Sequence, residues 1–207
     1  MNADEFWSLP RSTPPAKIFG EIAADLPVRL PTATLSQASV VHILGTGGGS
    51  WSSRLVDGRL EVQAGAATDP ICQVTLERAT LREFVAGSLR DRGLEIMAKL
   101  GRARQIPDLS RLPVRDDRAR ALSKLVGSVA IEIHDRTFGE THRVVVTFGG
   151  GTPEFERATV TVRVDADQAA GWIASRADAR AILKGGSLRI DGDLSLVTRA
   201  AALLLDP

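Results

Sequence analysis

The sequence predicts an α+β fold, in which a sheet of about five strands is covered by helices on one face and occurs in two related copies. Three observations favour it. Short segments that alternate apolar and polar residues precede helical segments in both halves of the chain. The tripeptide Asp-Leu-Ser occurs twice, at residues 108–110 and 193–195, each time shortly after an isoleucine. An apolar segment with helical spacing, residues 194–204, follows the second occurrence.

The first copy is expected to begin with a helix and to continue as a sheet. Thr-Pro-Pro at residues 13–15 is typical of a helix start, because proline is tolerated in a first turn. Strands are predicted over residues 40–44, 51–56, 59–63 and 71–76, joined by a Gly-rich turn at 45–49 and an Asp-Gly turn at 57–58. Helices are predicted next, over residues 80–87 and 91–100.

A basic helix over residues 115–125 is expected to connect the two copies, which we place at residues 1–114 and 126–207. The second copy should contain strands over residues 128–133, 142–148 and 158–164, followed by a helix over 167–175. A last strand over residues 187–190 and a tight turn at Asp191-Gly192 lead to the closing helix. The Asp193 carboxylate is expected to cap that helix by accepting hydrogen bonds from N–H groups of its first turn.

The two halves repeat the same order of elements, at a spacing of about 85 to 88 residues. The strand at 40–44 parallels that at 128–133, and Phe84 and Trp172 fall at matching places after later strands. Any two strand–helix units look alike to some degree. The recurrence of Asp-Leu-Ser at the right offset favours a degenerate duplication.

Composition restricts the class of protein. The chain has 207 residues, of which 43% are hydrophobic and 25% charged, as is ordinary for a globular protein. A net charge of +1 argues against nucleic acid as a partner. The single cysteine, Cys72, excludes an intramolecular disulfide, and the first residues lack the basic start and apolar run of a signal peptide. We therefore expect a cytoplasmic protein.

Residues suited to catalysis or metal binding are few. The three histidines, His42, His134 and His142, lack the spacing of metal ligands, so no metal or other cofactor is expected. The Gly-rich run at residues 45–50 could cradle a phosphate, but a strand pattern follows it where a phosphate loop needs a helix. Cys72 lies on a predicted buried strand and is interpreted as a small core residue. No catalytic residue is predicted, and the protein is not expected to be an enzyme.

Basic residues accumulate over residues 99–124, from the end of the first predicted copy through the connecting helix: Lys99, Arg102, Arg104, Arg111, Arg115, Arg118, Arg120 and Lys124. Three aspartates among them reduce the excess of positive charge. The simpler interpretation is a solvated surface. The alternative is contact with the anionic headgroups of a membrane surface or with a coenzyme A phosphate.

The C-terminal strand, the Gly-Asp turn and the amphipathic closing helix together resemble the sterol carrier protein 2 family of lipid-binding domains. The resemblance extends upstream to a hairpin with Trp51 on one strand, the turn at Asp57-Gly58, and a third strand that leads into a helix. About half of the chain matches in order and spacing. The resemblance implies non-catalytic binding or carrying of a hydrophobic small molecule, such as a lipid, a sterol-like molecule, a fatty acid or an acyl-CoA, in an apolar tunnel between sheet and helices.

The family lines its tunnel with residues of the sheet and of the closing helix. Together with helical and strand periodicity, this implies the ligand-binding residues Trp51, Leu55, Phe84, Met97, Leu100, Trp172, Ile173, Ile182, Leu188, Leu194, Val197 and Leu204. The same residues would equally make a dry core. Two other classes therefore stay open: a structural or protein-interaction module that keeps the fold without an open cavity, and, less favoured, a hydrolase or isomerase.

Overall fold

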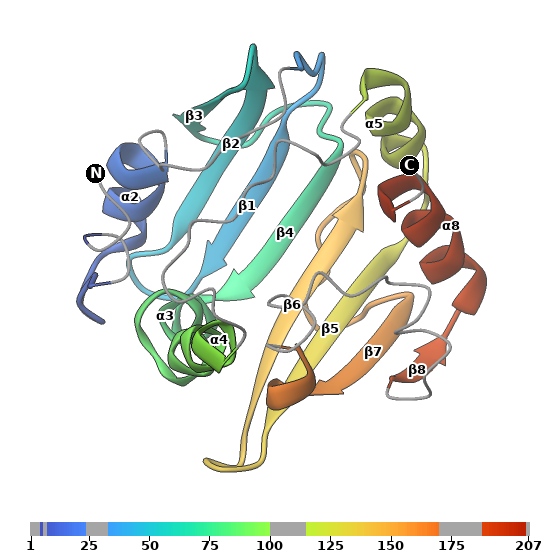
Figure 1. Ribbon diagram of the computed structural model, residues 1–207. Helices are drawn as coiled ribbons and strands as arrows, with labels where there is room; N and C mark the ends of the chain where they lie inside the picture. The colour runs from blue at the N-terminus through green and yellow to red at the C-terminus, as the bar shows by residue number, and fades with distance from the viewer. Residues whose placement is uncertain (1–4, 6–7, 24–32, 100–114, 170–187, 206–207) are drawn as a thin grey trace.

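Eight strands form one continuous sheet in the computed structural model, which describes residues 5, 8–23, 33–99, 115–169 and 188–205 (Figure 1). The strand order is β3-β2-β1-β4-β6-β5-β7-β8. Helices stand at the margins of the sheet in the same view, with α3 and α4 at one end and α5 and α8 along one side. The predicted α+β class is confirmed.

The first half of the chain supplies four strands and the helices beside them. Its described elements are α2 (Pro15–Lys17), the π-helical η1 (Ile18–Ile22), β1 (Ser39–Leu44), β2 (Gly49–Val56), β3 (Arg59–Ala64), β4 (Cys72–Glu77), α3 (Arg78–Ala86) and α4 (Ser88–Lys99). The helix start at the Thr-Pro-Pro sequence is confirmed, since Pro15 occupies the first helical position. All four predicted strands are present.

The second half supplies the other four strands and the closing helix. Its described elements are α5 (Asp116–Ser123), β5 (Ser128–Asp135), β6 (Glu140–Phe148), β7 (Val160–Asp165), β8 (Arg189–Gly192) and α8 (Leu194–Leu205). Residues 166–169 are helical, at the start of the helix predicted over 167–175, and the remainder of that helix lies outside the described residues.

Both halves contain an antiparallel hairpin followed by a strand that runs parallel to the first strand of the hairpin. In the first half these strands are β1, β2 and β4, and in the second half they are β5, β6 and β7. Antiparallel pairing of β4 with β6 joins the two sets. The sheet therefore has more strands than the five expected for one copy, because both halves of the chain contribute strands to one sheet. Whether the halves arose by duplication stays a prediction.

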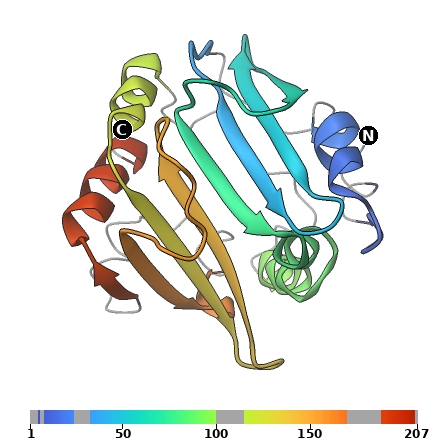
Figure 2. The same cartoon turned by 180° about the vertical axis from the view of Figure 1, so that it is seen from behind.

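The two faces of the sheet differ in character, because paired residues share a face. One row of paired residues consists of Val41, Val74, Val146, Val129 and Val160. The helices pack on this apolar face, which we call the inner face. The opposite, outer face is turned toward the viewer in Figure 2.

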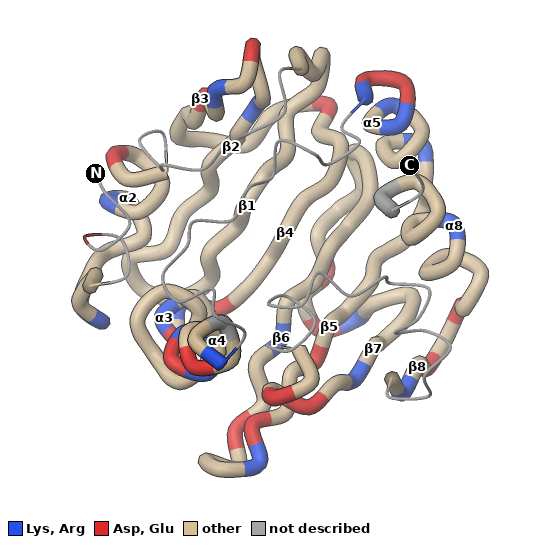
Figure 3. Tube along the Cα trace, viewed as in Figure 1, with Lys and Arg blue, Asp and Glu red and all other residues tan. Residues whose placement is uncertain are grey.

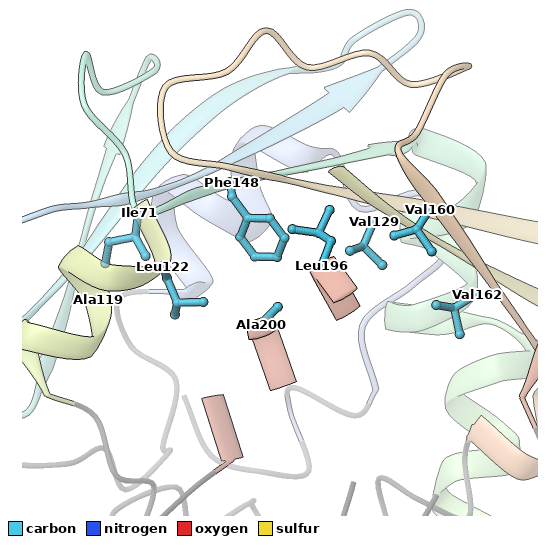
Figure 4. Close-up of a cluster of buried hydrophobic side chains, with 9 residues drawn as sticks. All are labelled: Ile71, Ala119, Leu122, Val129, Phe148, Val160, Val162, Leu196 and Ala200. Atoms are coloured by element: carbon cyan, nitrogen blue, oxygen red, sulfur yellow. The ribbon is translucent and has the colours of Figure 1, made fainter. Parts of the chain in front are cut away.

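The core consists of three clusters on the inner face. The α3 cluster joins η1 and α3 to the strands through Ile18, Ile43, Trp51, Leu76 and Leu81. The α8 cluster joins α5 and α8 to the sheet through Ala119, Leu122, Leu196 and Ala200 against Phe148, Val129, Val160, Val162 and Ile71 (Figure 4). The α4 cluster contains Leu89, Ile133, Val164 and Ala166.

The end of β8 differs from the predicted tight turn. Asp191 and Gly192 belong to the strand and pair with β7, although Gly192 has the positive φ of +107° that the turn would need. The chain enters α8 directly through Asp193, whose Oδ1 accepts hydrogen bonds from the backbone N–H groups of Ser195 (2.9 Å) and Leu196 (3.4 Å). The predicted cap is therefore confirmed. Among the described helices, none is long and apolar enough to cross a membrane.

Candidate functional site

Five apolar side chains on the inner face of the central strands are only half-buried: Val41, Val74, Ile131, Val144 and Val146. We call them the apolar strip. The register places them together, since Val74 pairs with both Val41 and Val146, and Val144 pairs with Ile131. Most of β1, β2 and β4 is free of charged residues (Figure 3). The strip is therefore continuous across four strands from both halves of the chain.

The strip lies where two core clusters meet. Val41, Val74 and Val144 pack against the α3 cluster, whereas Ile131 and Val146 pack against the α8 cluster. On the opposite face of the same strands, the side chains of Val40, Ala130 and Val145 are fully buried, unlike those of the strip. Accessible apolar surface at the centre of a sheet is unusual, because a packed core normally covers it.

Three predicted ligand-binding residues of the first half are described, and two of them adjoin the strip. Trp51 is buried in the α3 cluster and stacks on Phe19, with ring centroids 5.0 Å apart. Phe84 is half-buried and packs against both the α3 and α4 clusters. Leu55 is buried farther along β2. The structure thus brings Trp51 and Phe84 to one side of the strip.

Three predicted residues of the second half are described as well. Leu188 is half-buried and packs against the α8 and α4 clusters, and Val197 packs against the α8 cluster. Leu194 lies in the first turn of α8 and is 55% exposed. Leu188 and Val197 therefore pack against the same cluster as the strip residues Ile131 and Val146, whereas Leu194 faces solvent. Four of the remaining predicted residues lie outside the described residues: Leu100, Trp172, Ile173 and Ile182. The other two, Met97 and Leu204, belong to described helices, but the positions of their side chains are outside the description.

Sequence reasoning missed the polar residue that shares this face. His142 is 5% exposed, pairs with Ile133 in the register, and lies two residues before Val144 on the same side of β6. Its Nε2 atom is buried and has no hydrogen-bond partner. The alternation of β6 could have placed His142 beside Val144 and Val146.

The outer face carries polar networks that the sequence did not reveal, because their members come from different strands. His42 Nδ1 lies 2.8 Å from Ser50 Oγ, and His42 Nε2 lies 2.9 Å from Gln73 Oε1. Gln73 donates from its amide nitrogen to backbone carbonyls of Gly149 and Gly151, so its oxygen accepts from His42 Nε2–H. His42 Nδ1 is then left to accept the Ser50 hydroxyl proton.

Charged residues continue this polar surface toward the β8 edge. Glu132 accepts hydrogen bonds from Arg143 and Arg163, and Arg163 also pairs with Asp191. An open depression of about 550 Å³ lies elsewhere on the molecule and is lined by polar residues that include Ser52, Glu61 and Gln63. None of these surfaces suits an apolar ligand, which leaves the apolar strip as the candidate site.

Neither the Cys72 thiol nor the described basic residues near the junction of the two halves is suited to act as a reactive or anion-binding group. Burial raises the pKa of the Cys72 thiol, which favours the unreactive protonated form. Lys99, Arg115 and Arg120 each pair with a carboxylate. Within the described ranges, no group of three or more His, Cys, Asp or Glu side chains could hold a metal ion.

Comparison with known proteins finds a family match in the second half of the chain. Residues 108–205 match the model of the SCP-2 sterol transfer family, which confirms the resemblance stated from the sequence. The described elements within this segment are α5, β5 to β8 and α8. A search of curated proteins found no match.

Solved structures with some similarity include two sterol carrier proteins. Sterol Carrier Protein 2 Like 2 from Aedes aegypti is 15% identical, with a TM-score of 0.30, and the match covers 55% of this chain and 93% of that chain. Sterol Carrier Protein 2 from Yarrowia lipolytica, in its apo form, is 15% identical, with a TM-score of 0.31, covering 40% of this chain and 75% of that chain. A double mutant of the sec-alkyl sulfatase PisA1 is 18% identical, with a TM-score of 0.26, covering 60% of this chain and 26% of that chain.

Proposed function

Because residues 108–205 match the model of the SCP-2 sterol transfer family, we propose that this protein binds a hydrophobic small molecule on the apolar strip and performs no chemistry on it. The ligand class is a lipid, a sterol-like molecule or a fatty acyl chain. The strip and its neighbours Trp51, Phe84, Leu188 and Val197 form the binding surface.

The single observation that carries this proposal is the half-buried state of the strip. Five apolar side chains on four adjacent strands remain partly accessible on the face that the helices cover. Removing apolar ligand surface from water gains roughly 25 cal/mol per Å². A ligand that buries about 300 Å² would gain about 7 kcal/mol before the cost of ordering it. That gain is large enough for micromolar binding when ordering costs are small.

Calorimetry on lipid-stripped protein tests the proposal directly. Titration with a fatty acid, a sterol and an acyl-CoA should reveal binding of at least one, with a negative heat-capacity change because apolar surface leaves water. Native mass spectrometry of the purified protein should detect co-purified lipid. Absence of heat and of any thermal shift with all three ligands would reject the proposal and favour the structural or interaction module.

Filling the strip should weaken binding without unfolding the protein. Val146→Phe keeps an apolar side chain on a half-buried position but occupies the space that the ligand would use. Val126→Phe is the matched control, because Val126 is 87% exposed and lies outside the strip. We expect the first variant to lower ligand affinity and the second to leave it unchanged, at melting temperatures close to that of the parent protein.

The Ser50–His42–Gln73 chain is the observation that bears on a second candidate function, hydrolysis. A serine whose proton is accepted by a histidine is the beginning of a nucleophilic site. Gln73 is neutral, however, and replacing the orienting carboxylate by an amide costs about 10⁴-fold in the serine protease triad. We therefore assign the hydrogen bonds that join Ser50, His42 and Gln73 a structural role in the sheet. Labelling of Ser50 by a fluorophosphonate probe, lost in His42→Ala, would instead establish the hydrolase.

A further inference from the structure

His142 places a polar atom at the end of the apolar strip. It lies on β6 in the same alternating series as Val144 and Val146, and its cross-strand partner Ile133 belongs to the α4 cluster. The side chain is 6% exposed, and Nε2 is buried without a hydrogen-bond partner. Such an atom is costly to leave unsatisfied, so a ligand group or a water that hydrogen-bonds it is stabilised.

The charges around His142 restrict what it can bind. The Glu140 carboxylate lies 3.8 Å from His142 Nε2 and would repel an anionic group. Two arginines on nearby elements are already neutralised: Arg92 by Asp135 and Asp167, and Arg11 by Glu83. A ligand carboxylate would therefore meet a negative neighbour and cations that are already paired.

A hydroxyl group suits this position better than a carboxylate. A hydroxyl both donates and accepts, so it can satisfy Nε2 in either neutral tautomer of the histidine. A carboxylate only accepts, and its burial without a paired charge is unfavourable. Because His142 precedes Val144 and Val146 on the same side of β6, the apolar body of a ligand whose head meets Nε2 can cover these two valines.

We propose that His142 hydrogen-bonds the uncharged hydroxyl head of a ligand whose apolar body lies on the apolar strip, so that the ligand is a long-chain alcohol or a sterol rather than a fatty acid. This inference rests on the proposed function. It adds the orientation of the ligand, with the polar head at His142, beside Ile133 of the α4 cluster, and the apolar body over Val144 and Val146 of β6 toward Val74 of β4.

Competition between ligands that differ only in their head group tests the inference on the full chain. A pyrene-labelled alkane is bound to lipid-stripped protein and displaced by 1-hexadecanol, hexadecane or hexadecanoate, each delivered from cyclodextrin. His142→Leu removes the hydrogen bond while keeping an apolar side chain. Relative to the parent protein, it should reduce the affinity ratio of hexadecanol to hexadecane by about three- to tenfold, the worth of one hydrogen bond.

Two further variants keep the comparison specific. His134→Leu is the matched control, because His134 is exposed, lies on the outer face and contacts Thr141 there. It should leave the ratio unchanged. His142→Gln retains a hydrogen-bonding side chain and should preserve part of the preference for the alcohol.

A spectroscopic measurement on the parent protein provides the same test if His142→Leu does not fold. In protein with labelled histidine, hexadecanol, but not hexadecane, should move the nitrogen resonance of His142 Nε2.

The outcomes separate the two proposals. Failure of the parent protein to bind the pyrene-labelled alkane would overturn the proposed function. Binding of the alkane with an unchanged alcohol-to-alkane ratio in His142→Leu, or with an unmoved Nε2 resonance, would overturn the role of His142 alone. A preference for hexadecanoate over hexadecanol that depends on His142 would overturn the uncharged head group.

Discussion

Two glycines, Gly192 and Gly65, have nearly the same backbone conformation but different surroundings. Their φ angles are +107° and +102°, in a region that L-residues rarely adopt. A Cβ atom on Gly192 would lie 2.4 Å from the carbonyl oxygen of Thr159, whereas one on Gly65 would meet nothing within 4 Å. Backbone strain is thus common to both positions, and the steric clash is specific to Gly192.

Gly192→Ala should therefore destabilise the protein more than Gly65→Ala. Strain costs on the order of 1 to 3 kcal/mol at either site, and the clash at Gly192 adds to it because the contact is with backbone. The sequence alone suggests that valine would be worse than asparagine at this position. The Cβ contact makes both substitutions unfavourable. Chemical denaturation of the two alanine variants checks the prediction, and equal midpoints would contradict it.

Asp193 should make stability depend on pH in the acid range. Its pKa is lowered, first by the hydrogen bond from the Ser195 hydroxyl and then by the backbone N–H groups of Ser195 and Leu196. A lowered pKa in the folded state stabilises the protein above the unfolded value of about 3.9. That contribution is lost as the pH falls through the lower, folded value.

Asp193→Asn isolates this effect, because asparagine caps a helix without titrating in this range. The parent protein should be the more stable at pH 6, and the difference between the two melting temperatures should shrink as the pH falls below about 4. Asp193→Ala should melt roughly 2 to 4 °C below the parent at pH 6. A constant difference between parent and Asn variant across the range would show that the carboxylate charge does not contribute.

At the scale of single elements, Leu196 and Leu194 of α8 provide a matched pair. Leu196 is fully buried and lies beside Phe148 and Val129 of the sheet (Figure 4), whereas Leu194 is 55% exposed. Leu196→Ala should destabilise the protein by about 2 to 5 kcal/mol, because it removes buried methyl groups and leaves a cavity. Leu194→Ala should change stability by less than about 0.5 kcal/mol. Urea denaturation measures both, and comparable losses would mean that α8 docks by a different face.

Most element boundaries were predictable because local chemistry determines them. The alternation in β6 and the turn at Asp57-Gly58 fix strands to within one or two residues of their predicted ends. The candidate site was predictable only in part. Trp51 and Phe84 follow from periodicity, but partial burial of Val74 or Val146 depends on what packs above them. The unpartnered state of His142 likewise depends on neighbours distant in sequence, which a local pattern cannot specify.

At the scale of the whole molecule, the two halves of the chain are joined by more than the β4–β6 pairing. Asp135, at the end of β5, is 0% exposed and accepts a hydrogen bond of 2.8 Å from Arg92 of α4. It also accepts from the Ser88 hydroxyl at the start of α4 and from the backbone N–H of Thr137. This buried carboxylate therefore fixes a helix of the first half to a strand of the second.

Arg92→Met should destabilise the whole protein, because it leaves the Asp135 carboxylate buried without its counter-charge. Loss of one partner of a buried ion pair costs about 3 to 5 kcal/mol, and methionine retains much of the apolar length of the arginine.

Arg136→Met is the control for Arg92→Met. Arg136 pairs with Asp165 at the surface, where side-chain exposures are 76% and 31%, so its loss should cost less than about 1 kcal/mol. Urea denaturation followed by both far-UV circular dichroism and tryptophan fluorescence should show one shared transition, shifted to lower urea in Arg92→Met. A shift no larger than that of Arg136→Met would mean that the α4–β5 contact does not hold the halves together and that the shared sheet alone does so.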